Sequence, residues 1–321
     1  MESIQAPVQA ELQEFRRQFA ATLQSDNTLL QAALTHILNR SGKMVRPTMV
    51  MLSARTVGVV GQRVMDVALA LELLHTASLV HDDVVDESDE RRGQSSLNAM
   101  MTNQIAVLVG DYILSRALHH AAATGSAEIV DAVAMLGQTL ADGELQQLAN
   151  LDSEVINENS YYLVVRKKTA SLFAACAQLG VTAAGGSAEQ AERMRQLGSL
   201  VGTCFQLRDD LLDFRGSERL GKPSGNDMRE GKITLPVISA LKHSQSEEIQ
   251  RLALLVRRRE ATDEDISKLT CLATQKGGVE YTQWAMKEFS MMADGLIDEQ
   301  ADAEIVQALH AFVLFMSDRD F

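Results

Sequence analysis

Two groups of aspartates have a spacing that could hold a metal ion. The pattern D-D-x-x-D occurs twice, as Asp82, Asp83 and Asp86 and as Asp209, Asp210 and Asp213. On a helix, residues i and i+4 lie about 40° apart and residues i and i+1 about 100° apart, so each set of three carboxylates shares one face. Carboxylates at this spacing repel one another unless a cation neutralises them. Mg²⁺ prefers oxygen ligands and is commonly held by one or two carboxylates together with substrate phosphate oxygens. Each group is therefore a candidate Mg²⁺ site.

A solvated acidic face is the ordinary alternative for one such group. The chain has 21 aspartates among 321 residues, and random placement at that frequency gives about 0.09 such patterns per chain. The chance of two is then well under roughly 1%. Both groups also follow apolar helical runs, so we interpret the pair as functional.

Basic residues near the ends of the expected helices could bind phosphate groups. They are Lys43, Arg46, Arg91, Arg92, Lys168, Lys222 and Lys232. The forked guanidinium of Arg and the point charge of Lys suit diphosphate oxygens. The sequence has no GxxxxGK[ST] or GxGxxG motif, so no nucleotide-binding loop is indicated. Any one of these residues alone is more often a surface charge, so the prediction rests on the set.

Charge and composition exclude several classes of function. The chain has 30 Lys and Arg against 43 Asp and Glu, a net charge of −13, which argues against broad binding to nucleic acid or anionic lipid. The N-terminal residues lack the apolar segment of a secretory signal. The sequence contains no run of 18 apolar residues, which is the pattern that would indicate a transmembrane segment. The three cysteines have no metal-ligand spacing and are typical of a reducing compartment. We expect a soluble, cytoplasmic protein.

Helices are expected to position all of these residues. The four prolines leave residues 48–222 free of helix breakers, and that stretch is rich in Ala, Leu, Met, Gln and Glu. No sustained alternation of apolar and polar residues predicts strands. The apolar spacing predicts helices near 8–24, 28–40, 47–58, 63–87, 104–122, 127–150, 158–184, 188–215, 233–243, 246–258, 263–274, 278–294 and 300–316.

The pattern along the chain indicates one all-α domain. Residues 64–80 are apolar nearly all round, which is typical of the central helix of a helical core. The longest irregular segment, 215–231, is long enough to be functional. Because no repeat and no linker-like change of composition occurs, we predict a single domain over residues 1–321.

Several motifs together resemble the trans-isoprenyl (polyprenyl) diphosphate synthase family. In order along the chain they are GKMVRP, ELLHTASLVHDDVVDESDERRG, GDYILSRAL, KKTASLF, FQLRDDLLDF and GKPSGNDMREGKITLP. They run from about Gly42 to Pro236, and the similarity is weaker at both ends. The resemblance implies a single large all-α bundle around a deep central cavity, usually in a homodimer.

The resemblance also implies the reaction. An allylic diphosphate would condense head to tail with isopentenyl diphosphate, with two to three Mg²⁺ ions per active site. The two aspartate groups would bind these ions from facing walls of the cavity.

The remaining roles are likewise carried over from the family motifs. The allylic diphosphate would be held by Arg91, Lys168, Lys222 and Lys232. The isopentenyl diphosphate would be held by Lys43, Arg46, His75 and Arg92. The allylic cation would be lined by oxygen dipoles of Thr169 and Gln206. A lone histidine on an apolar helix is more often a core residue, but His75 lies two helical turns before Asp82, as in the family motif.

Small residues near the first aspartates predict a long product. If the growing tail runs along this helix, Ala77 and Ser78 are the first obstacles, about 6–7.5 Å from Asp82 along the axis. Short-chain members of the family often have bulky aromatics there, or two extra residues in the acidic motif. We therefore predict a long-chain polyprenyl product of about thirty to fifty carbons, suited to a quinone side chain.

Other functions remain as alternatives. The chain could make a shorter product, as geranylgeranyl and farnesyl diphosphate synthases do, or serve as a non-catalytic regulatory subunit of a heteromeric synthase. Such subunits commonly lose one aspartate group, whereas both are intact here. A cyclase would not need a second diphosphate pocket, and a di-iron bundle would need Glu-x-x-His pairs. The chain ends in MSDRDF, which lacks the basic cluster found at the end of many family members, so Arg319 is not assigned to the site.

Overall fold

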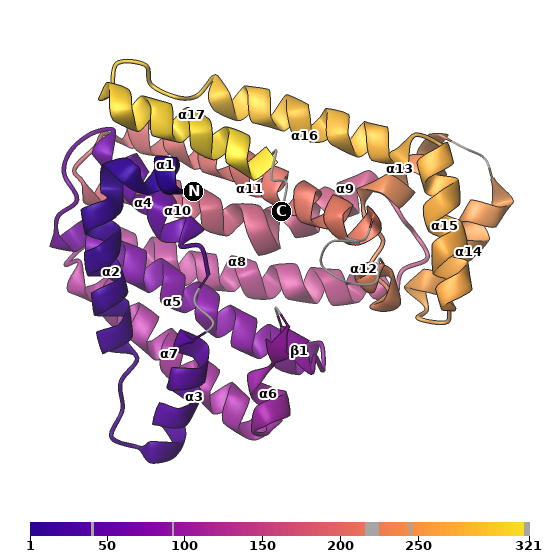
Figure 1. Ribbon diagram of the computed structural model, residues 1–321, viewed down its shortest axis with the longest axis horizontal. Coiled ribbons are helices and arrows are strands. Elements are labelled where there is room, and N and C mark those ends of the chain that lie inside the picture. The colour runs from indigo at the N-terminus through magenta and orange to yellow at the C-terminus, as the bar shows by residue number, and fades with distance from the viewer. Residues whose placement is uncertain (40–41, 92, 216–224, 244–245, 318–321) are drawn as a thin grey trace. The chain divides into compact units, whose positions relative to one another are not determined.

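The protein folds almost entirely into helices. The computed structural model describes residues 1–39, 42–91, 93–215, 225–243 and 246–317, without the side chains of Arg91 and Arg215 (Figure 1). The predicted all-α class is confirmed. One small difference is an antiparallel pair, β1 (Glu90–Arg91) and β2 (Gln94–Ser95). Two residues per strand are too few to produce a visible alternation in the sequence.

The chain groups into two compact units. Unit 1 comprises Met1–Gln138, Leu172–Gly198 and Leu296–Phe312, and unit 2 comprises Thr139–Ser171, Ser199–Gly295 and Val313–Phe321. The single domain over residues 1–321 therefore stays a prediction.

Unit 1 contains the N-terminal helices. They are α1 (Glu2–Gln5), the short 3₁₀ turn η1 (Ala6–Val8), α2 (Gln9–Thr22), α3 (Thr28–Leu38), α4 (Val45–Arg55), α5 (Gln62–Val85), α6 (Leu97–Met100) and α7 (Asn103–Ala123). Parts of α8 (Ala127–Leu151), α10 (Ser171–Ala183), α11 (Ala188–Arg215) and α17 (Ala303–Ser317) also belong to it.

Helix α5 forms the centre of unit 1. It packs against α2, α4, α6 and α7, and residues such as Leu69, Leu71 and Leu73 are fully buried. Within the described residues, α5 is long and apolar enough to cross a membrane, but 67% of its most apolar window is buried inside the protein. That burial is what a core helix shows.

A buried polar network ties three helices of unit 1 together. His120 Nδ1 lies 2.9 Å from the carboxylate of Asp66, and His120 Nε2 lies 3.1 Å from the hydroxyl of Thr22. Asp66 and Thr22 are 7% and 6% exposed. Polar groups this deep are costly unless they are hydrogen-bonded, so the network fixes α2 and α7 on α5.

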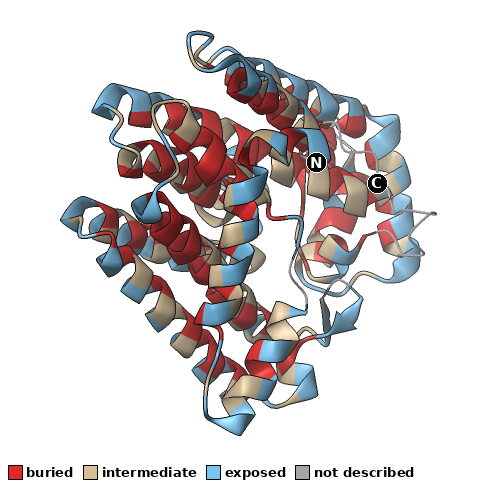
Figure 2. Ribbon diagram, turned by 60° about the vertical axis from the view of Figure 1, so that its left-hand side comes forward, coloured by how far each residue is buried: buried red, intermediate tan, exposed pale blue. Residues whose placement is uncertain are grey.

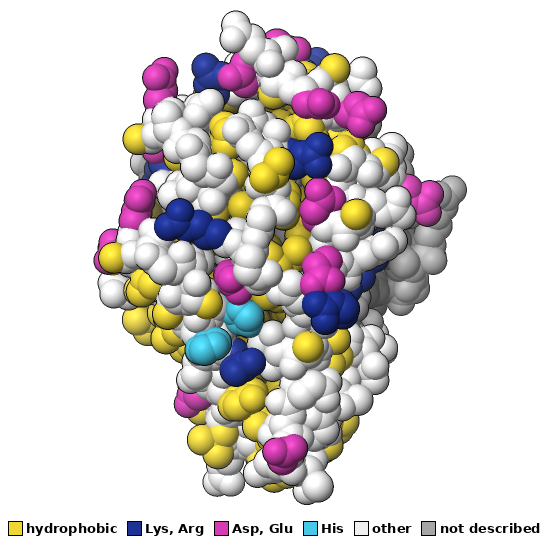
Figure 3. Space-filling model, turned by 90° about the vertical axis from the view of Figure 1, so that its left-hand side faces the viewer, with side chains coloured by type: hydrophobic (Ala, Val, Ile, Leu, Met, Phe, Trp, Pro, Cys, Tyr) yellow, Lys and Arg dark blue, Asp and Glu magenta, His cyan; other side chains and the backbone are white. Residues whose placement is uncertain are grey.

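Unit 2 contains the shorter helices. They are α9 (Glu158–Val165), the π-helical turn η2 (Arg166–Ala170), α12 (Asn226–Arg229), α13 (Leu235–His243), α14 (Glu247–Arg257), α15 (Asp263–Gln275) and α16 (Gly278–Asp294). Its core is formed by Cys204, Leu207, Leu211 and Phe214 of α11 with apolar residues of α13 to α16. In Figure 2 many helices carry buried positions along one side and exposed positions along the other. On the face of the surface shown in Figure 3, side chains of both charges stand among exposed apolar ones.

The π-helical turn is the main departure from the predicted helices. A single helix was expected over 158–184, but α9 ends at Val165 and η2 precedes α10. A π turn accommodates one extra residue within a helix and often occurs at functional sites. Apolar periodicity cannot reveal a one-residue insertion of this kind.

Candidate functional site

The first aspartate group lies at the C-terminal end of α5. Asp82 and Asp83 are in the last turn, and Asp86 is the C-cap residue, whose N–H donates to Asp82 O at 2.8 Å. Asp83 is 3% exposed, while Asp82 and Asp86 are partly exposed. The structure thus keeps the three residues together over one turn, as the spacing predicts.

A short hairpin follows this group. The Ser96 hydroxyl donates to Ser88 O at 2.5 Å, and Ser96 N–H donates to Asp89 O at 2.8 Å. Gly93 has φ +73°, a conformation that favours glycine, and makes the turn between β1 and β2. Arg91 is the last residue of β1, and Arg92 lies outside the described residues.

Arg46 lies in the first turn of α4, beside α10. Its guanidinium carbon is 5.3 Å from the centroid of the Phe173 ring. Burial raises the pKa of the Cys176 thiol to about 12, while the charge of Arg46 lowers it and that of Glu72 raises it. Arg46 and Glu72 are therefore both near Cys176, which brings α4 close to the middle of α5. His75 lies one turn after Glu72 and is partly exposed, and Lys43 is exposed in the segment before α4.

Ala77 and Ser78 lie on different faces of α5. Ala77 is 1% exposed and stands one turn before His81, whose imidazole occupies the space beside Gly110 of α7. Ser78 is partly exposed and stands one turn after Leu74, which faces Gly137 of α8 with 3.8 Å between the Leu74 Cδ1 and an added Cβ. Ala77 therefore turns towards α7, and Ser78 turns towards α8.

The second aspartate group lies on α11, in unit 2. The apolar residues in the C-terminal half of α11 face the core of unit 2. The polar residues of the same segment therefore lie on the other side of the helix, namely Gln206, Asp209, Asp210 and Asp213. Asp210 is 3% exposed, and the other three are partly exposed. The predicted facing of the two aspartate groups involves both units and stays a prediction.

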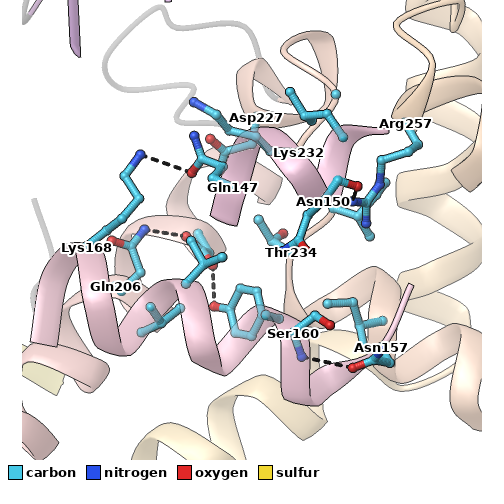
Figure 4. Close-up of a pocket in the computed structure, with 18 of the residues that line it drawn as sticks. Gln147, Asn150, Asn157, Ser160, Lys168, Gln206, Asp227, Lys232, Thr234 and Arg257 are labelled. Carbon is cyan, nitrogen blue, oxygen red and sulfur yellow. Dashed lines mark hydrogen bonds between the residues drawn. The ribbon is translucent and has the colours of Figure 1, made fainter. Parts of the chain in front are cut away.

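The π turn brings Lys168 and Thr169 close to α8. Gly143 of α8 makes this approach possible, because a Cβ there would lie 2.8 Å from Lys167 Cβ and 2.9 Å from Lys168 Cγ. Lys168 forms a salt bridge with Glu144, the next residue of α8. Its Nζ also donates to Gln147 Oε1 at 3.1 Å (Figure 4). The lysine head is thereby held beside the cavity described below.

A chain of hydrogen bonds joins the π turn to the second aspartate group. Thr169 Oγ1 donates to Gln206 Oε1 at 2.6 Å, and Gln206 Nε2 donates to Asp210 Oδ1 at 2.8 Å. The hydroxyl of Tyr161 donates to the other carboxylate oxygen of Asp210. The order Thr169–Gln206–Asp210–Tyr161 therefore links three predicted site residues with one that was not predicted.

Asp213 caps the short helix α12. Its two carboxylate oxygens accept hydrogen bonds from the N–H groups of Asn226 and Asp227 at 3.1 and 3.0 Å. The N–H of Gly225, which has φ +82°, donates to the Asp213 carbonyl at 2.9 Å. These bonds place the Asp227 side chain near Asp210 and Asp213, whose charges raise its pKa.

A cavity of about 120 Å³ collects these groups. Its polar lining residues are Gln147, Asn150, Asn157, Ser160, Tyr161, Lys168, Thr169, Gln206, Asp210, Asp227, Lys232, Thr234 and Arg257 (Figure 4). Lys232 pairs with Glu230 at 2.5 Å, and Arg257 donates to the Asn150 carbonyl at the end of α8. Cations and carboxylates thus line one cavity within unit 2.

Burial and the repulsion between neighbouring charges govern the carboxylates that line this cavity, Asp210 and Asp227, and the adjacent Asp213. Burial raises the pKa of Asp210 from 3.8 to about 7, although hydrogen bonds from Tyr161 and Gln206 lower it. Burial also raises the pKa of Asp213, more than its bonds to backbone N–H groups lower it. Burial and the charges of Asp210 and Asp213 raise the pKa of Asp227 well above its usual value.

The donor set suits a hard divalent cation. Three carboxylates with raised pKa values share one site, and a bound cation would favour their ionised forms. In the part of the chain that the structure describes, no three acidic, histidine or cysteine side chains lie in positions where they could hold a metal ion by themselves. Mg²⁺ does not require three such side chains, because it usually combines one or two carboxylates with substrate phosphate oxygens and water.

These pKa values predict how the stability of the metal-free protein depends on pH. In the unfolded chain Asp210 ionises near its usual pKa of 3.8, but in the folded protein it keeps its proton up to about pH 7. The folded state therefore binds more protons between these values, and the free energy of unfolding should fall as pH rises from 4 to 7. In chelator, the fall should be on the order of a few kcal/mol.

Denaturant unfolding at several pH values in chelator measures this dependence. Asp210→Asn should flatten the curve and stabilise the protein at pH 8, because no charge then has to form at this buried position. Asp131→Asn, on the exposed surface of α8, is the matched control and should keep the wild-type slope. Equal slopes for Asp210→Asn and the wild type would contradict the assignment.

The structure therefore brings five predicted residues together in unit 2, namely Lys168, Thr169, Gln206, Asp210 and Lys232. Lys222 lies outside the described residues, as does Arg319. Tyr161, Asp227, Glu144 and Gln147 also belong to the site but were not predicted. No pattern in the sequence points to Tyr161, because its partner Asp210 lies 49 residues further along the chain.

Comparisons with known proteins agree with this geometry. The family model described as polyprenyl synthetase matches residues 27–272. Octaprenyl diphosphate synthase of Haemophilus influenzae is 35% identical over 325 residues, covering 100% of this chain and 98% of that protein. Heptaprenyl diphosphate synthase component 2 of Geobacillus stearothermophilus is 40% identical over 220 residues, covering 68% of this chain and 69% of that protein.

Solved structures show the same likeness. A polyprenyl synthase from Caulobacter crescentus, complexed with calcium and isoprenyl diphosphate, has a TM-score of 0.91 and 31% identity, covering 99% of this chain and 98% of that one. A geranylgeranyl pyrophosphate synthase from Bacteroides thetaiotaomicron has a TM-score of 0.87 and 38% identity, covering 99% of both chains.

Proposed function

This chain belongs to the polyprenyl synthetase family, and from that premise we propose that it condenses isopentenyl diphosphate with an allylic diphosphate to give a long-chain all-trans polyprenyl diphosphate. It is a prenyltransferase, as its named relatives are. The single observation that carries the proposal is the cavity of unit 2, where Lys168, Lys232 and the buried Asp210 meet. These are the groups that a metal-bound diphosphate needs.

The residues of unit 2 would hold the allylic substrate. Lys168 and Lys232 would exchange their carboxylate partners, Glu144 and Glu230, for diphosphate oxygens. By the family motif, Lys222 would bind the same diphosphate. Asp209, Asp210 and Asp213 would hold Mg²⁺, which supplies positive charge against the negative charge that builds on the leaving diphosphate. The oxygens of Thr169 and Gln206 would face the allylic cation, since the hydrogen bond between the two side chains fixes their orientation.

The residues of unit 1 would hold the second substrate. Isopentenyl diphosphate would bind Lys43, Arg46, His75 and Arg92, while Asp82, Asp83 and Asp86 would complete the metal site and Arg91 would contact the allylic diphosphate. The carbon–oxygen bond of the allylic substrate breaks, and the double bond of isopentenyl diphosphate attacks the cation. A proton then leaves the new carbon chain for the departing diphosphate, which restores a double bond. Two to three Mg²⁺ ions would serve one active site.

The product would be long. Ala77 and Ser78 place no bulky side chain one turn before Asp82, and the octaprenyl and heptaprenyl relatives make long chains by their names. Such a chain would suit a quinone side group. A geranylgeranyl product remains the second candidate, because the Bacteroides thetaiotaomicron enzyme of that name is 38% identical.

The assembly would be a cytoplasmic homodimer. Helix α7 carries three exposed large apolar residues, Val107, Leu108 and Leu118, and exposed apolar residues on one helix favour burial against another chain. The Geobacillus stearothermophilus relative is named as a component, so a heteromeric assembly is the alternative. Both aspartate groups are intact, which favours a catalytic chain over a regulatory one.

Product analysis tests the function directly. Purified protein with Mg²⁺, isopentenyl diphosphate and allylic primers of several lengths should give polyprenyl diphosphates, seen by mass spectrometry. The products should form a ladder ending well beyond four isoprene units, and chelation of Mg²⁺ should abolish it. If no primer is extended, the proposed function is wrong.

A further inference from the structure

Tyr161 lies at a point of the cavity where it touches the second aspartate group directly. It is in the middle of α9, one turn before the π turn, and it lines the cavity together with Lys168 and Asp210. Its hydroxyl donates a hydrogen bond to Asp210 Oδ2. A phenol next to a buried carboxylate is a hydrogen-bond donor at physiological pH, because its proton is far more firmly held than that of the acid.

Asp210 therefore has a fixed orientation before any ligand arrives. One carboxylate oxygen accepts from Tyr161, and the other accepts from Gln206 Nε2 at 2.8 Å. Each carboxylate oxygen has two lone pairs, so each can accept one hydrogen bond and still present a lone pair to a cation. The two donors come from different helices, α9 and α11, which prevents the carboxylate from rotating about its side-chain bond.

The neighbouring ring holds Tyr161 in place. Tyr162 packs edge to face against Tyr161 with ring centroids 5.3 Å apart, and against Phe289 of α16 with centroids 5.8 Å apart. Tyr162 packs on the apolar core of unit 2. The two adjacent tyrosines thus have different tasks: one ring anchors α9 in the core, and the other directs a hydroxyl at Asp210.

We propose that Tyr161 is a positioning residue for the metal site, because its hydroxyl holds the Asp210 carboxylate in the orientation that binds Mg²⁺ together with a diphosphate. The proposal rests on the proposed function only for the identity of the ligands. Residues that orient a metal ligand from outside typically contribute about 10- to 100-fold in metal affinity or activity. Loss of the Tyr161 hydroxyl should therefore weaken metal binding and leave the fold intact.

Matched phenylalanine variants test the proposal. Tyr161→Phe removes only the hydroxyl bonded to Asp210, and Tyr162→Phe removes a hydroxyl from the adjacent ring and serves as the control. The first measurement is the Mg²⁺ concentration that gives half-maximal condensation. It should rise about tenfold in Tyr161→Phe, with kcat recovering at saturating Mg²⁺, and should stay within twofold of wild type in Tyr162→Phe.

A second measurement needs no turnover. Mg²⁺ with inorganic diphosphate should raise the melting temperature of the wild type and of Tyr162→Phe at a lower Mg²⁺ concentration than it does for Tyr161→Phe. In an Asp210→Asn background, Tyr161→Phe should cause no further change, because the hydroxyl then has no metal-binding carboxylate to orient. This double-variant result separates positioning from a general loss of packing.

The outcomes distinguish the two proposals. Equal Mg²⁺ dependence of Tyr161→Phe and the wild type, in both measurements, would overturn the role of Tyr161. The role would also be overturned if Tyr161→Phe shifted the Mg²⁺ dependence of the melting temperature equally in the wild-type and the Asp210→Asn backgrounds. If the wild type fails to condense any primer, the proposed function is wrong, while the binding measurement with inorganic diphosphate still decides on Tyr161.

Discussion

Replacing Asp209 by alanine is expected to lower kcat by about three orders of magnitude while the protein stays folded. Asp209 begins the second aspartate group, and its charge already raises the pKa of the adjacent Asp210. In the proposed mechanism its carboxylate holds a Mg²⁺ ion that offsets charge on the leaving diphosphate. Because that charge grows as the bond breaks, the loss should fall on kcat. Steady-state product formation at saturating primer and Mg²⁺ measures it.

The control makes the same substitution, aspartate to alanine, at a residue outside the proposed site. Asp131→Ala removes a carboxylate from the exposed surface of α8 and should retain wild-type turnover. The melting temperature of metal-free Asp209→Ala should equal or exceed that of the wild type, because one of the repelling charges is gone. If kcat of Asp209→Ala falls by less than tenfold, Asp209 is not a ligand of the catalytic Mg²⁺.

An aromatic residue at position 77 or 78 is expected to shorten the product by several isoprene units. Both residues lie one turn before Asp82, and neither fills the space that a phenyl ring would take. Ser78→Phe is the safer variant, since Ser78 is partly exposed. Ala77 is 1% exposed, and overpacking a buried site costs about 1–3 kcal/mol. Mass spectrometry of the product ladder measures the shift.

A third phenylalanine variant controls for the ring itself. Val59→Phe introduces a phenyl ring at a residue that is 78% exposed. This variant should give the same distribution of product lengths as the wild type. Melting temperatures identify any variant that has lost its fold rather than its chain length. An unchanged ladder in both folded variants would show that the tail does not pass this level of α5.

The sequence was sufficient to predict the long helices, but not the short helices α1, α6 and α12. The long stretch without proline, and the three-and-four spacing that makes residues 64–80 apolar nearly all round, correctly indicated α5 as a buried central helix. The D-D-x-x-D spacing also predicted that Asp209, Asp210 and Asp213 share one face of α11. These features depend on local composition and on the period of 3.6 residues, which a sequence displays directly.

The features that were missed depend on contacts between distant segments. Tyr161 and Asp210 are 49 residues apart, and a tyrosine in an apolar stretch gives no sign that its hydroxyl will reach a carboxylate. Asp227 lies in a segment without periodicity, where only the capping of α12 by Asp213 brings it into the site. In the sequence, nothing distinguishes Glu144 from the other acidic residues of its helix, and only the structure shows its salt bridge with Lys168. Tertiary packing, not propensity, decides each of these cases.

The π turn between α9 and α10 also has a consequence for evolution. A five-residue turn of this kind is an insertion of one residue that the helix absorbed without a loop. Deleting Arg166 or Lys167 would restore an ordinary helix with α9 and α10 nearly in line, but Tyr161 and Lys168 would then be six residues apart instead of seven, which changes their relative direction around the helix axis. Lys168 and Tyr161 could then not both keep their partners, Glu144 and Asp210. During evolution, the side chains of residues 166–170 can therefore change more freely than the number of residues in this segment. The spacing between Tyr161 and Lys168 should change more slowly than the identities of the residues between them.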